Sequence, residues 1–287
     1  MNTTGMDPAS FGESCIMDWK ELQRRISSPA LIAEKDPYLI KIADTPEEVL
    51  ETQKLRYRVF NQEQGKGLTA AEADGIDRDE YDDTSLHLVV REKNLDMPVG
   101  TYRIILGQES VGAMYSSREY EIFGLDAFLP MTLEVGRSCV DPEHRAGSVV
   151  ALLWAGISEI MTRSGMRYLT GCVSLEDTRP EAAWAMYEYF RRHDLIMNEI
   201  RGVPRKQFVL PRPDEKAIEA VLADSSSFRR LFPPLLKGYF RMGAKICGEP
   251  AFDYEFGTTD YLIILDVAHL PSRYNKHFNV TVGEKQA

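Results

Sequence analysis

The chain has 287 residues, of which 44% are hydrophobic and 27% charged, as expected for a globular protein with a full core. A formal net charge of −10 excludes a general nucleic-acid binder, because such proteins need a basic face. No apolar run reaches the ~18 residues of a membrane-spanning helix. Residues 1–14 hold no Lys, no Arg and no apolar segment, so we expect no secretory signal. Four well-separated cysteines predict reduced, buried thiols in a cytoplasmic protein: Cys15, Cys139, Cys172 and Cys247.

The predicted elements begin with an extension, residues 1–36, that carries one short helix near residues 17–26. A strong helix start follows, because Thr45 can cap, Pro46 suits the first turn and Glu48 completes a capping box. This helix should run to about Phe60. Residues 61–84 then form a long acidic loop, and a loop of that length is usually functional or disordered.

Strands and helices alternate through the centre of the chain. Residues 86–91 and 99–106 predict a hairpin, residues 131–140 a third strand, and residues 149–163 an apolar helix that ends at Gly165. A strand over residues 167–175 precedes a helix that starts at Thr178 and runs to about His193. Because this order favours parallel pairing, we predict an α/β core. A helix over residues 228–242, broken by two prolines, and an apolar strand over 261–267 complete one domain of residues 37–275, with a tail of residues 276–287.

Charged residues inside two of these strands are the candidates for chemistry, because a buried charge is costly unless it is paired. Arg103 follows a glycine on one strand, and Glu134 and Arg137 lie on the next. Residues three apart on a regular strand face opposite sides, but Gly136 permits a β-bulge that re-aims one of them. A carboxylate held beside cations in a cleft can accept a proton from an amine. A plain ion pair or a solvent-facing Glu134 fits the same pattern.

Four segments together resemble a known signature: Arg56 with Phe60, Asp79 with Asp82, Arg103 after a glycine, and Glu134 with Arg137. They resemble acyl-homoserine lactone synthases, and still more the related GNAT-type N-acyl amino acid synthases and L-ornithine Nα-acyltransferases of ornithine lipid synthesis. The stretches 133–145, 171–175, 243–253 and 256–257 are similar to the latter group, so the resemblance covers about residues 38–275. It implies an α/β GNAT (acyl-CoA N-acyltransferase-like) fold, with a mixed central sheet splayed between two parallel strands and flanked by helices.

Two departures from these families narrow the function. Lactone synthases carry a tryptophan in their S-adenosylmethionine pocket where this chain has Lys66, which disfavours that substrate. GNAT acetyltransferases cradle the CoA pyrophosphate with a glycine-rich loop at a helix N-terminus. Here the loop, residues 145–151, keeps one glycine. An acyl carrier protein presents only a 4′-phosphopantetheine arm, without adenosine diphosphate, so the loss of glycines favours acyl carrier protein over CoA as donor.

The resemblance also implies roles for individual residues. Glu134 would be the base, Arg103 and Arg137 would orient it or grip the acceptor's carboxylate, and Asp79 and Asp82 would hold the ammonium. A backbone N–H near residues 137–139 would polarise the thioester carbonyl. The other substrate-binding positions that it implies are Arg56, Phe60, Cys139, Val140, His144 and Arg145. No bound cofactor and no metal are expected.

An acidic carrier protein needs a basic patch on this acidic chain. The first basic group comprises Arg201, Arg205, Lys206 and Arg212. The second comprises Arg229, Arg230, Lys237 and Arg241, and is interleaved with apolar side chains. Either group can take the carrier, and the second can instead lie on an anionic membrane surface. Both patterns also fit ordinary solvated faces.

The sequence therefore predicts an enzyme that moves a (3-hydroxy)fatty acyl chain from acyl carrier protein to the α-amine of an amino acid. Ornithine is the first choice of acceptor, which would give a lyso-ornithine lipid. Glycine or tyrosine as acceptor, a lactone synthase, a haemolysin-like lytic protein and a non-catalytic carrier-binding regulator are the alternatives. We expect a cytoplasmic protein that can contact the inner membrane peripherally.

Overall fold

A computed structural model describes residues 24, 26–107, 113–145 and 147–270, and its main feature is a nine-stranded mixed sheet. The strand order is β1-β2-β3-β4-β6-β7-β11-β10, with β9 also paired to β11, while β5 and β8 form a separate two-stranded sheet. The strands are β1 Leu31–Lys35, β2 Tyr38–Ile42, β3 Leu86–Glu92, β4 Met97–Leu106, β5 Tyr120–Phe123, β6 Thr132–Val140, β7 Tyr168–Leu175, β8 Arg201–Pro204, β9 Lys245–Ile246, β10 Ala251–Asp253 and β11 Thr258–Asp266.

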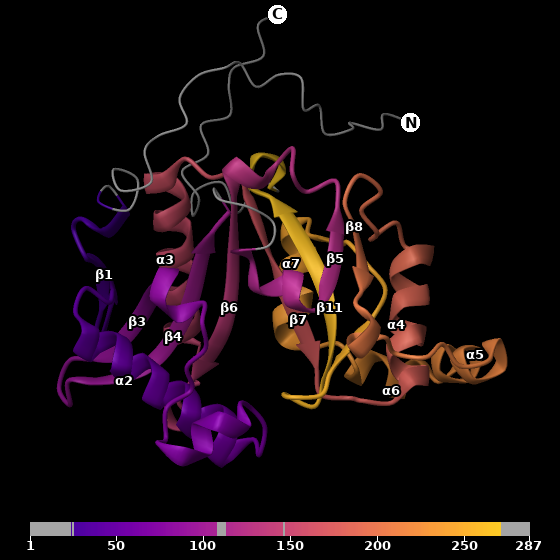
Figure 1. The fold of residues 1–287 in the computed structure, drawn as a ribbon, viewed down its shortest axis with the longest axis horizontal. Coiled ribbons are helices and arrows are strands. Elements are labelled where there is room, and N and C mark those ends of the chain that lie inside the picture. Colours follow the sequence, from indigo (N-terminus) through magenta and orange to yellow (C-terminus); the bar gives the residue numbers. More distant parts are fainter. Residues whose placement is uncertain (1–23, 25, 108–112, 146, 271–287) are drawn as a thin grey trace, which may run out of the picture.

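Helices cover both faces of this sheet (Figure 1). The helices are α2 Pro46–Tyr57, α3 Ser148–Ser164, α4 Pro180–Arg192, α5 Glu215–Ala223, α6 Ser225–Arg230 and α7 Pro234–Met242. Helix α3 packs on β1 to β4 and β6, and its apolar stripe shares the main core with alternate strand residues such as Ile104 and Leu133. The residues between them, including Arg103 and Glu134, therefore face the side of α2.

The predicted splay of the sheet lies between β6 and β7, the one parallel pair of adjacent strands within the described sheet. Their pairing joins residues 132–134 to residues 168–170 and goes no further. In Figure 1 the two strands lie close at the top of the view and diverge below. They meet at Gly171, where an added Cβ would sit 2.4 Å from the carbonyl oxygen of Val135. The predicted mixed sheet, splayed between parallel strands and flanked by helices, is confirmed.

Several predicted boundaries need correction. Thr45 caps α2, with the amide of Glu48 donating at 3.2 Å, but this α-helix ends at Tyr57 and continues as a π-helix, Arg58–Glu63. Helix α4 starts after Arg179, which makes no side-chain cap bond, so Thr178 is not the cap. The extension predicted up to residue 36 contains β1, which is part of the main sheet.

Parts of the sequence predictions lie outside the described residues. These are residues 17–23 of the first predicted helix, the end of the domain from residue 271, the tail 276–287, and Cys15. Cys139 and Cys247 are buried, and Cys172 is half-buried, all as free thiols. Over the ranges that the structure covers, every helix is too short or too polar to cross a bilayer.

Candidate active site

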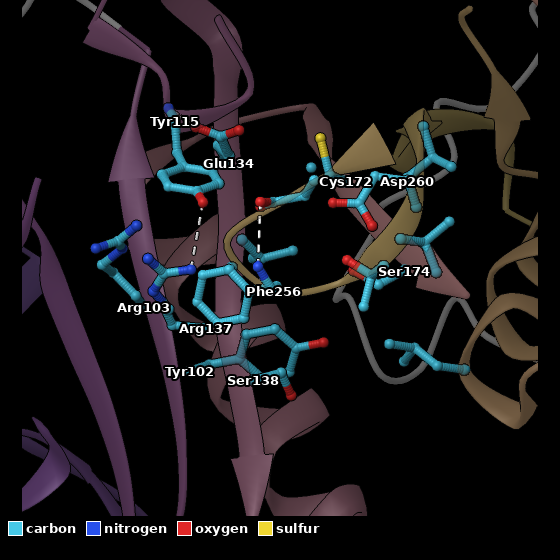
Figure 2. A pocket seen from close by; sticks show the side chains of 18 of the residues that line it. Tyr102, Arg103, Tyr115, Glu134, Arg137, Ser138, Cys172, Ser174, Phe256 and Asp260 are labelled. Carbon is cyan, nitrogen blue, oxygen red and sulfur yellow. Dashed lines mark hydrogen bonds between the residues drawn. The ribbon is translucent and has the colours of Figure 1, made fainter. Parts of the chain in front are cut away.

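A cavity of about 270 Å³ opens where β6 and β7 separate. The residues that line its end on the α3 side are apolar or aromatic: Tyr102, Val173, Leu235, Tyr239 and Ile263. The residues that line the other end are charged: Arg103, Glu134, Arg137, Asp253 and Asp260. Figure 2 shows Arg103 and Arg137 on one wall, and Cys172, Ser174 and Asp260 on the other. One end of the cavity can therefore accept an apolar chain and the other a doubly charged polar molecule.

Glu134 is a buried carboxylate at this charged end, with 2% of its surface exposed. Its Oε2 accepts the backbone N–H of Tyr115 at 2.6 Å, and its Oε1 accepts that of Ser116 at 2.8 Å. Burial raises the pKa of this carboxyl above its ordinary value, against the lowering effect of these hydrogen bonds. No ion pair joins Glu134 to Arg137 among the described residues, so neither the plain ion pair nor the solvent-facing glutamate is what the structure shows.

A β-bulge turns Arg137 toward the face of Glu134. Two residues of β6, Arg137 and Ser138, oppose the single residue Tyr102 of β4. The positive φ of the bulge, 50°, falls on Arg137 and not on Gly136, where the sequence predicted it. The predicted re-aiming of one side chain is thus present, one residue later than expected.

The acidic loop binds the arginine at the end of α2. Arg56 holds both carboxylate oxygens of Asp82 at 2.7 Å each and Oδ1 of Asp77 at 2.7 Å. Burial alone would raise the pKa of Asp82, but the hydrogen bonds and charge of Arg56 hold it well below its usual range. Neither Arg56 nor Asp82 lines the cavity, so their geometry suits the anchoring of the loop and not direct ligand contact.

Arg103 and Arg137 form the cationic wall of the cavity and share one carboxylate. Oδ1 of Asp79 lies 2.5 Å from Nη1 of Arg103, and its Oδ2 lies 3.0 Å from Nη2 of Arg137. The guanidinium of Arg137 also stacks 4.3 Å from the ring centre of Phe256. The predicted ammonium-binding role of Asp79 and Asp82 does not match this arrangement, because arginines occupy their oxygens.

One edge of the Arg103 guanidinium makes no hydrogen bond within the part of the chain that the structure describes. Its Nε and Nη2 make no hydrogen bond to any described residue, although the side chain is 1% exposed and lines the cavity. These two nitrogens form the edge of a guanidinium that can bind a carboxylate through two parallel hydrogen bonds.

Phe60 lines the cavity as well, and meets the ring of Phe256 edge-on at 5.8 Å. The other predicted substrate-binding residues lie outside the cavity lining: Cys139, Val140, His144 and Arg145. Burial raises the pKa of the Cys139 thiol to about 12. His144 sits 3.2 Å from a carboxylate oxygen of Glu92, and Arg145 pairs with Glu63 at 2.7 Å.

The two basic groups differ in their relation to the cavity. In the first group, Arg201 stacks on Phe123, Arg205 donates to the carbonyl of Ser117, and Lys206 is exposed. None of these three lines the cavity. The second group is exposed on α6 and α7, and α7 also supplies Leu235 and Tyr239 to the apolar end of the cavity.

Figure 2 shows Asp260 on the wall opposite the arginines. It belongs to a cluster of three carboxylates that the sequence did not reveal, with Glu119 and Asp253. Oxygens from the three lie within 4.8 Å of one another, and none of the residues is more than 4% exposed. Burial raises the pKa of Asp260 to about 6, and that of Glu119 well above its usual value. This is also the one cluster in the described ranges whose atoms are spaced to hold a metal ion. An acid directly before the apolar strand at 261–267 was the available sequence signal for Asp260.

The mixed sheet splayed between the parallel strands β6 and β7 is the architecture of acyltransferases of the GNAT class. Residues 55–155 match the family described as acetyltransferase (GNAT) domain. The chain is 33% identical over 252 residues to the L-ornithine N(alpha)-acyltransferase of Brucella abortus (strain 2308), covering 83% of this chain and 88% of that one. It belongs to this family of N-acyltransferases.

The chain is also similar to more distant proteins. The glycine N(alpha)-acyltransferase of Bacteroides thetaiotaomicron is 28% identical over 263 residues, covering 79% of this chain and 76% of that one. The solved structure of FeeM, an N-acyl amino acid synthase from uncultured soil microbes, is similar with a TM-score of 0.44 and 12% identity. That likeness covers 81% of this chain and 92% of FeeM.

Proposed function

We propose that this enzyme transfers a long acyl chain, 3-hydroxylated or plain, from acyl carrier protein to the α-amine of ornithine, which gives a lyso-ornithine lipid. The observation that carries the proposal is the two-ended cavity, apolar on the α3 side and charged on the α2 side, with Glu134 at the charged end. The name of the relative in Brucella abortus supports ornithine as the acceptor.

The acceptor's carboxylate binds the unpartnered edge of Arg103, beside Arg137. Asp79 and Asp82 act indirectly in this scheme. They hold the arginines in the wall and do not touch the amino acid. Because the Arg103 side chain is already held in place, it loses little conformational entropy when a carboxylate binds, and this favours binding.

Glu134 acts as the base. A carboxylate with a raised pKa is a stronger proton acceptor than an ordinary one, and the two backbone N–H groups leave it free lone pairs. It takes one proton from the α-ammonium, and the neutral nitrogen attacks the thioester carbonyl. The C–N bond forms, the C–S bond breaks, and the second nitrogen proton passes to the leaving thiolate.

The donor arm would enter along β6, whose pairing to β7 stops at Glu134 and so leaves a strand edge for the amides of phosphopantetheine. A backbone N–H at the bulge would polarise the thioester carbonyl. The loop at residues 145–151 keeps one glycine, which supports acyl carrier protein over CoA as the donor. The basic group on α6 and α7 is the better docking surface, since α7 lines the apolar end. The same surface would provide any contact with the inner membrane.

Lipid mass spectrometry tests this function in a bacterium that lacks acylated amino acids. Cells expressing the wild type or the control Glu121→Gln, an exposed carboxylate on β5, should gain N-acylornithine. Glu134→Gln should lower the product by ~10²-fold or more. Detection of acylated glycine or tyrosine would support the acyl transfer but would show that ornithine is not the acceptor. If the expressed protein gives no acylated amine, the proposed function is wrong.

A further inference from the structure

The carboxylates opposite the arginines come from three separate parts of the chain. Glu119 precedes β5, Asp253 ends β10, and Asp260 lies in β11, next to Ser174 of β7 in the sheet. Asp253 and Asp260 line the cavity, and Glu119 stands close enough for its oxygens to meet theirs. We call these three residues the acidic wall.

The acidic wall is electrostatically incomplete. No ion pair to any of its three carboxylates occurs within the described residues; the adjacent Arg118 pairs with Glu255 instead. Both oxygens of Glu119 and Oδ1 of Asp260 make no hydrogen bond of normal geometry to a described residue. Such buried, unpaired acids cost several kcal/mol unless a cation or protons neutralise them.

A separate observation points to a ligand at the same place. The hydroxyl of Thr258, a residue 7% exposed, lines the cavity beside Asp260 and makes no hydrogen bond of normal geometry to a described residue. Its contact with the Asp260 carboxylate lowers the pKa of that group but does not reach normal hydrogen-bond geometry. A hydrogen-bond donor entering from the cavity would satisfy both the hydroxyl and the carboxylates.

We infer that the acidic wall binds a second ammonium group of the acceptor and so selects an α,ω-diamino acid over amino acids with neutral side chains. An ammonium carries three N–H donors, which suits a site of several converging oxygens. The acceptor then spans the cavity, with its carboxylate at Arg103, its α-amine near Glu134, and its side-chain ammonium at Asp260 (Figure 2).

A divalent cation is the competing occupant, but the wall suits it less well. Calcium takes six to eight oxygens and magnesium an octahedral set. Here Oδ1 of Asp253 already accepts the backbone N–H groups of Glu255 and Phe256, at 2.7 and 3.2 Å. The inference rests on the proposed function, because it assigns the specificity of the same reaction.

The test compares ornithine with norvaline, which has the same carbon chain and no side-chain amine. The wild type should favour ornithine in kcat/KM by ~10- to 100-fold, the range of charge-assisted hydrogen bonds. Asp260→Asn should remove most of this preference by lowering the ornithine value, and should leave the norvaline value within about twofold. If Asp260→Asn does not fold, Asp253→Asn should show the same loss of preference for ornithine. Glu121→Gln is the matched control.

Two outcomes would overturn the inference. An equal loss for both amino acids in Asp260→Asn would mean that the carboxylate acts in the chemistry or in folding. Loss of the ornithine preference with EDTA, restored by Mg²⁺ or Ca²⁺, would mean a metal site. Calorimetric binding of the two amino acids needs no acyl donor. Tighter binding of ornithine would therefore support the wall even if no acyl transfer occurred, and equal binding would refute it.

Discussion

Asp82→Asn removes one negative charge from the buried ion-pair network while keeping the shape of the side chain. The lost carboxylate binds Arg56 through two bonds of 2.7 Å, lies 3.4 Å from Arg103, and accepts the backbone N–H of Asp79 at 3.0 Å. Removing one partner of a buried ion pair costs ~3–5 kcal/mol, because the other charge stays buried. Since asparagine keeps some hydrogen bonding, we expect a loss near the lower figure.

Urea unfolding measures this loss directly, and calorimetry should show a melting temperature lower by roughly 6–12 °C, at ~2–4 °C per kcal/mol for a large domain. The matched control is Asp83→Asn, at the exposed neighbouring position, which should change stability by less than ~0.5 kcal/mol. A loss below ~1 kcal/mol for Asp82→Asn would refute the account of the network.

The contribution of Asp82 to the stability of the fold also depends on pH. The folded-state pKa of Asp82 is lowered, so its ionised form stabilises the fold at every pH above the ordinary aspartate value, ~3.9. That contribution is lost as the pH falls through the folded-state pKa. The difference in stability between wild type and Asp82→Asn should therefore be constant near neutrality and shrink below about pH 4.

Other predictions concern the cavity itself. Arg103→Lys keeps the charge but loses the two-nitrogen edge, so KM for the amino acid should rise by ~10-fold or more; an unchanged KM would contradict carboxylate binding. Gly171→Ala places a Cβ 2.4 Å from the Val135 carbonyl and should cost ~1–3 kcal/mol in thermal unfolding; full stability would mean that the strands can separate freely. Because the pKa of Glu134 is raised and the base must be ionised, kcat/KM should fall with decreasing pH from a higher pH than an ordinary glutamate would give, and this limb should vanish in Glu134→Gln.

The sheet and its cationic wall could be predicted from the sequence because their signals are local. Apolar periodicity gives β6, α3 and β7, and charges inside otherwise apolar strands mark Arg103 and Glu134. The bulge was anticipated at the wrong residue, because glycine is the usual choice for a positive φ, and here Arg137 adopts it.

The partners of the charged residues could not be predicted in the same way. A sequence shows that Asp79 and Asp82 are acidic, but not that arginines from α2, β4 and β6 reach them. The acidic wall could not be predicted because its residues are far apart in the sequence. Its members are up to 141 positions apart, from 119 to 260, and are brought together only when β11 pairs with β7.

The most direct test of the central claim uses purified protein, a long-chain acyl carrier protein thioester and ornithine, with tandem mass spectrometry of the product. The wild type should form an amide on the α-nitrogen, and Glu134→Gln should form it at a ~10²-fold lower rate. An amide on the side-chain nitrogen, or equal rates for the two proteins, would contradict it.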